Sequence, residues 1–319
     1  MAKPPRALIV AGPTASGKSA LALGLAQRLG GCVINADAMQ LYRELRVLTA
    51  RPSPEEEAMV PHFLYGVRAA AAPASAAWWR EAALGAMAAA RAEGCVPILC
   101  GGSFLYLAGL VEGLAAIPEP GPTARAEARR LLAEIGPAAL HAGLAKVDPA
   151  TAARLRPTDS QRVARAWEVW RGTGRGLAAW QAERGAPAPW RFAAVLLDPP
   201  RAALREAIAA RFAAMLRAGA LEEVRGLLAL GLDPALPALR AHGVPELSAH
   251  LRGTLTLAEA ERRAVLVTGQ YTKRQATWLR HRPLIDPAHT HTIHARCTGL
   301  AQLSACETAP LMNFLRDAG

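Results

Sequence analysis

The chain has 319 residues, of which 52% are hydrophobic and 20% charged, so it is a globular protein and not a disordered one. No uninterrupted apolar run is long enough to span a membrane, and residues 1–6 contain no signal-peptide core, so we expect a cytoplasmic protein. The formal net charge of +11 favours a polyanionic partner, because lysines and arginines displace counterions from phosphate backbones. Drift in composition explains the charge equally well at this point.

Short apolar runs alternate with helical patterns along the first third of the chain. Residues 7–11 predict a strand, and residues 18–29 predict a helix after an intervening loop. The same signals recur, with strands expected at 31–35 and 96–100 and helices at 74–93 and 103–113. Strands that alternate with helices indicate the α/β class, with a parallel sheet covered by helices on both faces.

A different pattern begins after a proline-rich joint at residues 118–122. Residues 123–184 contain only helical signals, dense in arginine, before a strand pattern returns at 192–197. Helices are expected again at 201–217 and 258–282, and the remainder lacks periodicity. The predicted division is a core of residues 1–118 and 192–285, an inserted all-helical domain of 119–191, and a C-terminal tail of 286–319.

The loop after the first strand carries a phosphate-binding motif. Its sequence, Gly12-Pro13-Thr14-Ala15-Ser16-Gly17-Lys18-Ser19, fits G-x-x-x-x-G-K-[ST] between a strand and a helix. Backbone N–H groups of such a loop curl around a phosphate, and the helix N-terminus adds positive potential. We expect Lys18 to place its charge against terminal phosphate oxygens and Ser19 to hold Mg²⁺. The motif does not specify which phosphate compound binds.

Asp37 lies just past the second predicted strand. Ligands of doubly wound sheets bind beyond the carboxyl ends of the strands, so Asp37 is expected to face the same crevice as the phosphate loop. A carboxylate there can bind Mg²⁺ or act as a general base. A turn or helix cap made by Asn35 and Asp37 explains the same residues without catalysis, and the residues alone leave these alternatives open.

Further blocks follow the phosphate loop in order. They are residues 35–43 (NADAMQLYR), 49–52 (TARP), 101–106 (GGSFLY), 159–165 (DSQRVAR) and 270–278 (QYTKRQATW). Together with the loop they resemble the tRNA dimethylallyltransferases, also called the IPP transferase family. The resemblance runs from residue 12 to about residue 280, and the later blocks are far more specific than the loop.

The resemblance implies a fold and a reaction. It implies a P-loop NTPase-like parallel sheet flanked by helices, with an inserted all-helical RNA-binding domain. Members transfer a dimethylallyl group from dimethylallyl diphosphate to N6 of the adenosine 3′ to the anticodon, in tRNAs that read codons starting with U, and release diphosphate. The implied cofactor is Mg²⁺, and the implied partners are the tRNA anticodon stem-loop and dimethylallyl diphosphate, without a membrane. We expect a monomer.

The resemblance also assigns roles position by position. Asp37 matches the family's general base, Thr14 a residue close to the reacting centre, and Arg211 an arginine that supports the diphosphate. The implied tRNA contacts are Asp37, Ala38, Met39, Gln40, Ser103, Arg125, Gln161, Arg162, Val163, Ala164, Arg165, Arg240, Ala241, His242, Gly243, Val244 and Pro245. Ala38 replaces the usual serine, and residues 240–246 (RAHGVPE) replace a commoner Gly-Tyr-Lys/Arg pattern.

The residue types suit this chemistry. The exocyclic amine of adenine is a poor nucleophile, so a carboxylate that removes its proton as the C–N bond forms accelerates the reaction. Lys18, Arg211 and Mg²⁺ can stabilise the charge that develops on the departing diphosphate.

Other activities remain possible on sequence alone. In a small-molecule kinase with the same loop, Asp37 would activate a hydroxyl, but Cys100-Gly101-Gly102 lacks the acid that kinases usually carry after a strand. Prenylation of free AMP is a closer alternative, and the large arginine-rich insertion favours RNA. A non-catalytic RNA-binding module would leave Lys18, Ser19 and Asp37 without a role.

Overall fold

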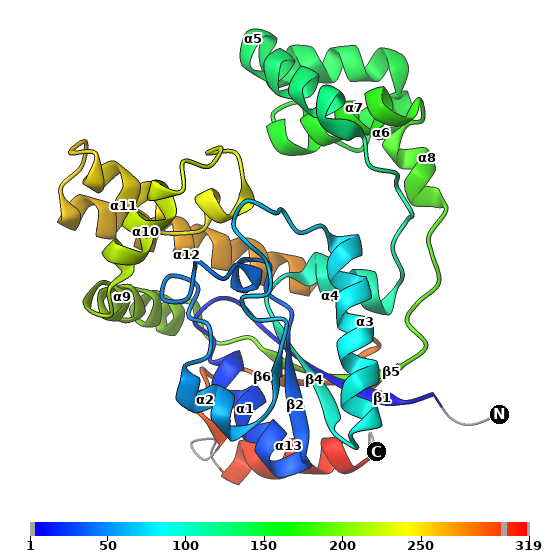
Figure 1. The fold of residues 1–319 in the computed structure, drawn as a ribbon. Helices are drawn as coiled ribbons and strands as arrows, with labels where there is room; N and C mark the ends of the chain where they lie inside the picture. Colours follow the sequence, from blue (N-terminus) through cyan, green and yellow to red (C-terminus); the bar gives the residue numbers. More distant parts are fainter. Residues whose placement is uncertain (1–3, 301–304, 318–319) are drawn as a thin grey trace. The chain divides into compact units, whose positions relative to one another are not determined.

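A computed structural model describes residues 4–300 and 305–317. The chain divides into two compact units (Figure 1). Met1–Val111 and Pro189–Gly319 form one, which we call the α/β unit, and Glu112–Ala188 form the other, the helical unit. The insertion predicted at 119–191 therefore begins and ends a few residues earlier.

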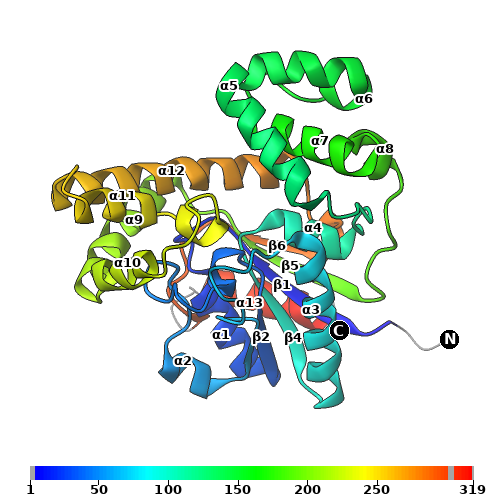
Figure 2. The ribbon, with the colours of Figure 1, turned by 45° about the horizontal axis from the view of Figure 1, so that its top comes forward.

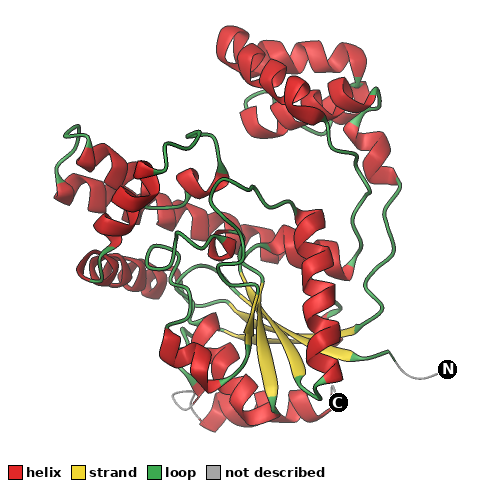
Figure 3. Cartoon of the chain, in the orientation of Figure 1, coloured by secondary structure: helices red, strands yellow, loops and turns green. Residues whose placement is uncertain are grey.

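The α/β unit contains a six-stranded parallel sheet, and Figure 3 draws its strands in yellow. The strand order is β3-β2-β4-β1-β5-β6. The strands are β1 (Arg6–Ala11), β2 (Gly31–Asn35), β3 (His62–Phe63), β4 (Val96–Gly101), β5 (Arg191–Leu197) and β6 (Thr290–Ile293). The predicted α/β class and parallel sheet are confirmed. The insertion separates β4 from β5 in sequence, yet both strands pair with β1.

Helices pack on the sheet. Those of the α/β unit are α1 (Lys18–Leu29), α2 (Pro54–Met59), α3 (Ala76–Ala92), α4 (Phe104–Val111), α9 (Arg201–Arg217), α10 (Ala220–Ala229), α11 (Val244–Leu251), α12 (Leu257–His281) and α13 (Ala305–Asp317), with 3-10 turns η1 (Met39–Leu41), η2 (Pro237–Arg240) and η3 (Pro287–His289). Of these helices, α9 to α12 form a further cluster beside the sheet. Within the described ranges no helix combines the length and apolar content needed to cross a bilayer.

Successive strand residues point to opposite faces of the sheet, and both faces are covered. On one face, Leu8 and Val10 of β1 belong to a buried cluster that also contains residues of α1 and α13. On the other face, Trp79 of α3 donates its Nε1–H to the Asn35 carbonyl at 2.8 Å and stacks on Tyr106 of α4. Burial on both sides explains why these strands read as continuous apolar runs.

The helical unit contains only helices and connecting loops among its described elements. They are α5 (Gly121–Val147), which is kinked at Gly136, α6 (Pro149–Ala152), α7 (Ser160–Thr173) and α8 (Leu177–Ala182). Buried Leu144, Ala152 and Ala166 form its small core. α7 begins at a cap in which Asp159 accepts from the Arg162 N–H, as expected for aspartate at a helix N-terminus.

The expectation that residues 286–319 form a tail without regular structure is wrong. β6 extends the sheet beside β5, and α13 places Leu311 and Leu315 in the core shared with α1. Residues 301–304 and 318–319 of that predicted tail lie outside the described residues. A four-residue edge strand is too short to show an alternating pattern, so its pairing depends on the neighbouring strand.

Candidate active site

The phosphate loop joins β1 to α1 at the carboxyl end of β1. The backbone of Ala15 and Gly17 is left-handed, with φ angles of 66° and 93°. A Cβ atom at Gly17 would lie 1.5 Å from the Cys297 carbonyl oxygen, so backbone conformation and crowding both require glycine there. Ser16 is fully buried, and its N–H donates to the Pro13 carbonyl at 3.2 Å. The loop therefore has one closely packed shape.

A glutamine from α12, the long helix that passes over the strands in Figure 2, holds this loop. Gln275 Oε1 accepts from the Thr14 N–H at 2.9 Å and from the Thr14 hydroxyl at 3.2 Å. Gln275 Nε2 donates to the Gly102 carbonyl at 2.9 Å, and the residue is 4% exposed. One buried amide thus links α12, the loop and the end of β4, and it orients the Thr14 hydroxyl.

Asp37 is placed by a turn at the end of β2. Its N–H donates to Asn35 Oδ1 at 2.8 Å, and its Oδ1 accepts from the Met39 N–H at 3.0 Å. Asn35 is itself buried and donates to the Asp37 carbonyl. The turn predicted as an alternative to a functional role is therefore present, and it holds the partly exposed carboxylate in one orientation. Among the described residues Oδ2 has no hydrogen-bond partner.

Lys18, Asp37 and Arg211 influence one another electrostatically. Burial lowers the pKa of Lys18, and the negative charge of Asp37 opposes that shift. Burial also lowers the pKa of Arg211, where Asp37 again opposes the shift and Arg296 adds to it. A single carboxylate thus lies near several cations, so this region favours an anionic ligand. We call the region around Lys18, Asp37 and Arg211 the phosphate-loop cleft, or simply the cleft.

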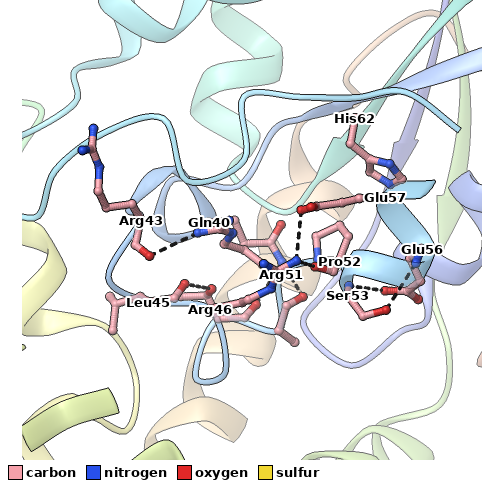
Figure 4. Close-up of polar contacts among 12 residues, drawn as sticks. Gln40, Arg43, Leu45, Arg46, Arg51, Pro52, Ser53, Glu56, Glu57 and His62 are labelled. Atoms are coloured by element: carbon pink, nitrogen blue, oxygen red, sulfur yellow. Dashed lines mark hydrogen bonds and ion pairs between the residues drawn. The ribbon is translucent and has the colours of Figure 1, made fainter. Parts of the chain in front are cut away.

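The segment after Asp37 is fastened by its own polar side chains (Figure 4). Gln40 is 9% exposed, and its Nε2 donates to the Thr49 carbonyl at 2.9 Å. Arg46 pairs with Glu57 at 3.3 Å. Arg211 reaches the same segment, its Nη2 donating to the Thr49 carbonyl at 3.4 Å. The Gln40 amide is therefore used inside the loop, and its contact with tRNA stays a prediction.

Ser103 supports the backbone next to Asp37. Its Oγ accepts from the Ala38 N–H at 2.9 Å, and its own N–H donates to the Ala36 carbonyl at 3.2 Å. Ser103 is only partly exposed. This serine therefore positions the aspartate turn, a role that sequence reasoning missed.

A cavity of about 1020 Å³ adjoins the phosphate loop between α9 and α12. Leu204 and Ile208 of α9 line it and also pack against Ala15 of the loop. The cavity is also lined by the basic residues Arg201, Arg205, Arg262, Arg263, Lys273 and Arg280. Asp198 and Glu259 line it as well, and Glu259 pairs with Arg262 and Arg263, so the cavity is mixed in charge with a basic excess.

Comparison with known proteins shows the family of this chain. A model of the IPP transferase family matches residues 40–282, and one of isopentenyl transferases matches residues 5–69. The chain belongs to the IPP transferase family. Its match spans the helical unit and most of the α/β unit. The resemblance inferred from the sequence blocks is confirmed.

Two relatives and one solved structure illustrate the similarity. The chain is 61% identical to the tRNA dimethylallyltransferase of Granulibacter bethesdensis, over 98% of this chain and 99% of the relative. It is 61% identical to that of Acidiphilium cryptum, over 97% and 94%. The full-length tRNA isopentenylpyrophosphate transferase of Bacillus halodurans shares its fold, with a TM-score of 0.68 and 28% identity over 98% of this chain and 96% of that chain.

The tRNA contacts inferred from the IPP transferase resemblance divide between the two units. Arg125 and residues 161–165 belong to the helical unit, and the others belong to the α/β unit. The side chains of Val163, Ala164, Ala241 and Val244 are at most 9% exposed and pack in the cores, so they offer no surface to RNA. The resemblance assigned whole segments of sequence to tRNA contact. Such a segment contains buried as well as exposed side chains, and the sequence alone does not distinguish them.

Most of the remaining predicted contacts are more accessible, although Gln40 and Gly243 are also buried. Gln161, Arg162, Arg240 and Pro245 are exposed, and His242 is partly buried with its ring 4.8 Å from that of Tyr271. Burial lowers the pKa of His242 and raises that of Tyr271 to about 12, so both are uncharged near neutral pH. The negative charge of Asp37 acts to raise the pKa of both residues, so this ring pair lies near Asp37.

Proposed function

We propose that this protein transfers a dimethylallyl group from dimethylallyl diphosphate to N6 of the adenosine 3′ to the anticodon, in tRNAs that read codons starting with U, and releases diphosphate. One observation carries the proposal: the Asp37 carboxylate lies near enough to Lys18 of the phosphate loop and to Arg211 for its charge to act on both. The names of the 61% identical relatives support the same substrates.

Asp37 is the general base in this proposal. As N6 attacks the allylic carbon of the donor, the carboxylate accepts the N6 proton, the carbon–oxygen bond breaks, and its electron pair leaves with the diphosphate. The hydrogen bond from Met39 to Oδ1 leaves Oδ2 for the proton. Such proton transfer contributes roughly 10²–10⁴-fold in rate.

The phosphate loop, Lys18 and Arg211 bind the leaving group. Their donors point at charge that grows as the carbon–oxygen bond breaks, which stabilises the transition state more than the ground state. Thr14 shapes the loop beside these groups, because its N–H and its hydroxyl both donate to Gln275. Burial and the charge of Arg211 disfavour the charged form of Lys18. A bound diphosphate would stabilise that charge.

Mg²⁺ fits the oxygen donors of this cleft. Ser19 is exposed at the start of α1, and its hydroxyl lowers the pKa of the neighbouring Cys100 thiol, although burial keeps that pKa at about 11. A hydroxyl, diphosphate oxygens and water are typical Mg²⁺ ligands. Ser19 would hold the ion, which when bound neutralises charge on the diphosphate.

Recognition of tRNA rests on exposed basic residues, above all Arg162 of the helical unit. Contacts between these residues and several RNA phosphates would release counterions, so we expect the affinity for tRNA to fall as the salt concentration rises. We expect a monomer that works in the cytoplasm, where tRNA and the donor are both present.

The test is label transfer. The protein is incubated with Mg²⁺, labelled dimethylallyl diphosphate and either an unmodified anticodon stem-loop, the same stem-loop with guanosine at the target position, or AMP. We expect label in the first RNA only, located on N6 by nucleoside mass spectrometry. Label on AMP with none on RNA, or no transfer at all, would refute the proposal.

A further inference from the structure

The residues that follow β6 lie directly against the phosphate loop. Arg296 donates from Nε to the Ala15 carbonyl at 3.1 Å, and the Cys297 N–H donates to the Ser16 carbonyl at 3.0 Å. The contact is close, because any side chain at Gly17 would collide with the Cys297 backbone. The segment after β6 thus packs on the loop from a part of the chain more than 270 residues away.

Arg296 brings a positive charge to this place without a carboxylate partner among the described residues. Its Nε is occupied by the Ala15 carbonyl, whereas no acid is paired with its guanidinium. Arg211 lies near enough for the charge of Arg296 to lower its pKa, in addition to the effect of burial. Two like charges are therefore held near one loop, an arrangement that an anion stabilises.

We propose that Arg296 binds the diphosphate of the donor, together with Lys18 and Arg211. This inference rests on the proposed function for the identity of the donor. Arg296 contacts the loop through one guanidinium nitrogen, so the others are available for phosphate oxygens, which guanidinium groups bind well. Anchoring by the Ala15 carbonyl limits the side-chain freedom that binding would otherwise remove.

A purely structural role is the alternative. In that case Arg296 would only fasten the segment after β6 to the loop, and its charge would be irrelevant to ligand binding. The two roles separate experimentally, because loss of an anchor lowers stability whereas loss of a ligand contact lowers diphosphate affinity at unchanged stability.

Arg191 provides a matched control. It is exposed, donates from Nε to the Pro4 carbonyl at 3.2 Å, and lies beside another arginine, Arg6, whose pKa it helps to lower. It begins β5, so it lies at the amino end of the parallel strands, whereas the phosphate loop lies at their carboxyl end. Arg191→Met thus removes the same kind of contact from a like-charged pair outside the cleft.

The experiment measures binding of inorganic diphosphate with Mg²⁺ by calorimetry, on the full chain, for wild type, Arg296→Met, Arg296→Lys and Arg191→Met. We expect Arg296→Met to weaken binding about tenfold and to reduce its salt dependence, and Arg296→Lys to stay within about threefold of wild type. Arg191→Met should bind as wild type does. Arg296→Met and Arg191→Met should lower the melting temperature by similar small amounts, because each removes one hydrogen bond to a backbone carbonyl.

Two results would overturn the inference. One is equal affinity of Arg296→Met and Arg191→Met. The other is an equal loss in Arg296→Lys and Arg296→Met, because the lysine retains the charge. The proposed function fails separately, by absence of label transfer to RNA in the wild type, which leaves the diphosphate comparison intact.

Discussion

The phosphate-loop cleft and the helical unit hold their charged groups in different ways. In the cleft, the backbone N–H groups of Asp37 and Thr14 donate to the buried side chains of Asn35 and Gln275. Lys18 and Arg211 have pKa values lowered by burial. In the helical unit, Arg162 pairs with Asp159 at 3.4 Å and Arg165 with Glu168 at 3.2 Å on the surface. Arg125 also pairs with a neighbouring acid, Glu119.

Under the proposed function, this difference separates catalysis from recognition. Groups that act on a transition state are effective when they need no rearrangement, so buried hydrogen bonds that fix them are useful. Surface ion pairs contribute little to stability, so the arginines of the helical unit can exchange a carboxylate for an RNA phosphate at small cost. We therefore expect changes in the cleft to affect rate and changes in the helical unit to affect tRNA affinity.

The largest effect is expected from Asp37→Ala. Without the base, the rate of a single turnover should fall roughly 10²–10⁴-fold, while the dissociation constant of the stem-loop changes little. Rapid-quench assays and filter binding measure the two quantities. A turnover rate equal to that of wild type would remove Asp37 from the role of base.

Lys18→Ala should lower kcat/KM for dimethylallyl diphosphate by about 10²–10³-fold, because the lysine charge stabilises the leaving group. In contrast to Asp37→Ala, this change should also weaken binding of inorganic diphosphate. Steady-state kinetics with saturating stem-loop and calorimetry test the two parts. Unaltered diphosphate affinity would contradict the assignment of Lys18.

Gln275→Leu removes the hydrogen bonds that hold Thr14 and Gly102, and it removes no charge from the cleft. It leaves the Thr14 N–H and the Gly102 carbonyl without their partner, so the free energy of unfolding should fall by about 1–3 kcal/mol, with a lower kcat. Gln270→Leu, an exposed position on the same helix, is the control and should change neither quantity. Urea denaturation measures the free energy of unfolding, and initial rates measure kcat. If both variants had the same values, the hydrogen bonds of Gln275 would be dispensable.

Replacement of Arg162 and Arg165 by alanine tests the other side of the comparison. Stem-loop affinity should fall about tenfold, and the slope of log affinity against log salt should flatten by about one to two, because phosphate contacts are lost. The KM for the donor should stay unchanged. Arg175→Ala removes an arginine paired with Glu183 in the same unit and serves as the control. An unaltered salt slope in the double variant would exclude these arginines from the interface.

The smallest effect concerns pH. Burial holds the pKa of His242 below its ordinary value of 6.5, with Arg274 acting in the same direction and Glu246 and Asp37 opposing. As pH falls through 6.5, the unfolded chain takes up a proton that the folded protein does not, so stability is lost. Urea denaturation at about pH 7.5 and about pH 5 should show a smaller acid loss for His242→Gln than for wild type or for a variant at the exposed His281. An identical loss in all three would contradict the burial of His242.

Much of the fold was predictable from the sequence, because its signals are local. The strands that precede the phosphate loop and Asp37 are short apolar runs next to glycine and polar residues, and both are present. The predictions were wrong where the signal is not local: β6 shows no alternation of its own, and α13 was taken as part of an irregular tail.

The candidate site shows the same division. The loop motif and Asp37 were found because each depends on a few neighbouring residues. Gln275 was noticed only as part of a matching block, since nothing near it in sequence indicates that its amide meets Thr14, 261 positions away. Val163 and Val244 were overestimated for the converse reason, because burial depends on packing partners elsewhere in the chain.

By itself the sequence determined a phosphate-binding loop on a parallel α/β core, an acid beside it, and a basic helical insertion. Those features follow from interactions between residues close together in the chain. Only the tertiary structure decided that Gln275 orients Thr14, that Ser103 supports the aspartate turn, and that Arg296 reaches the loop. Contacts of this kind join residues far apart in sequence, and their existence depends on how the whole unit packs.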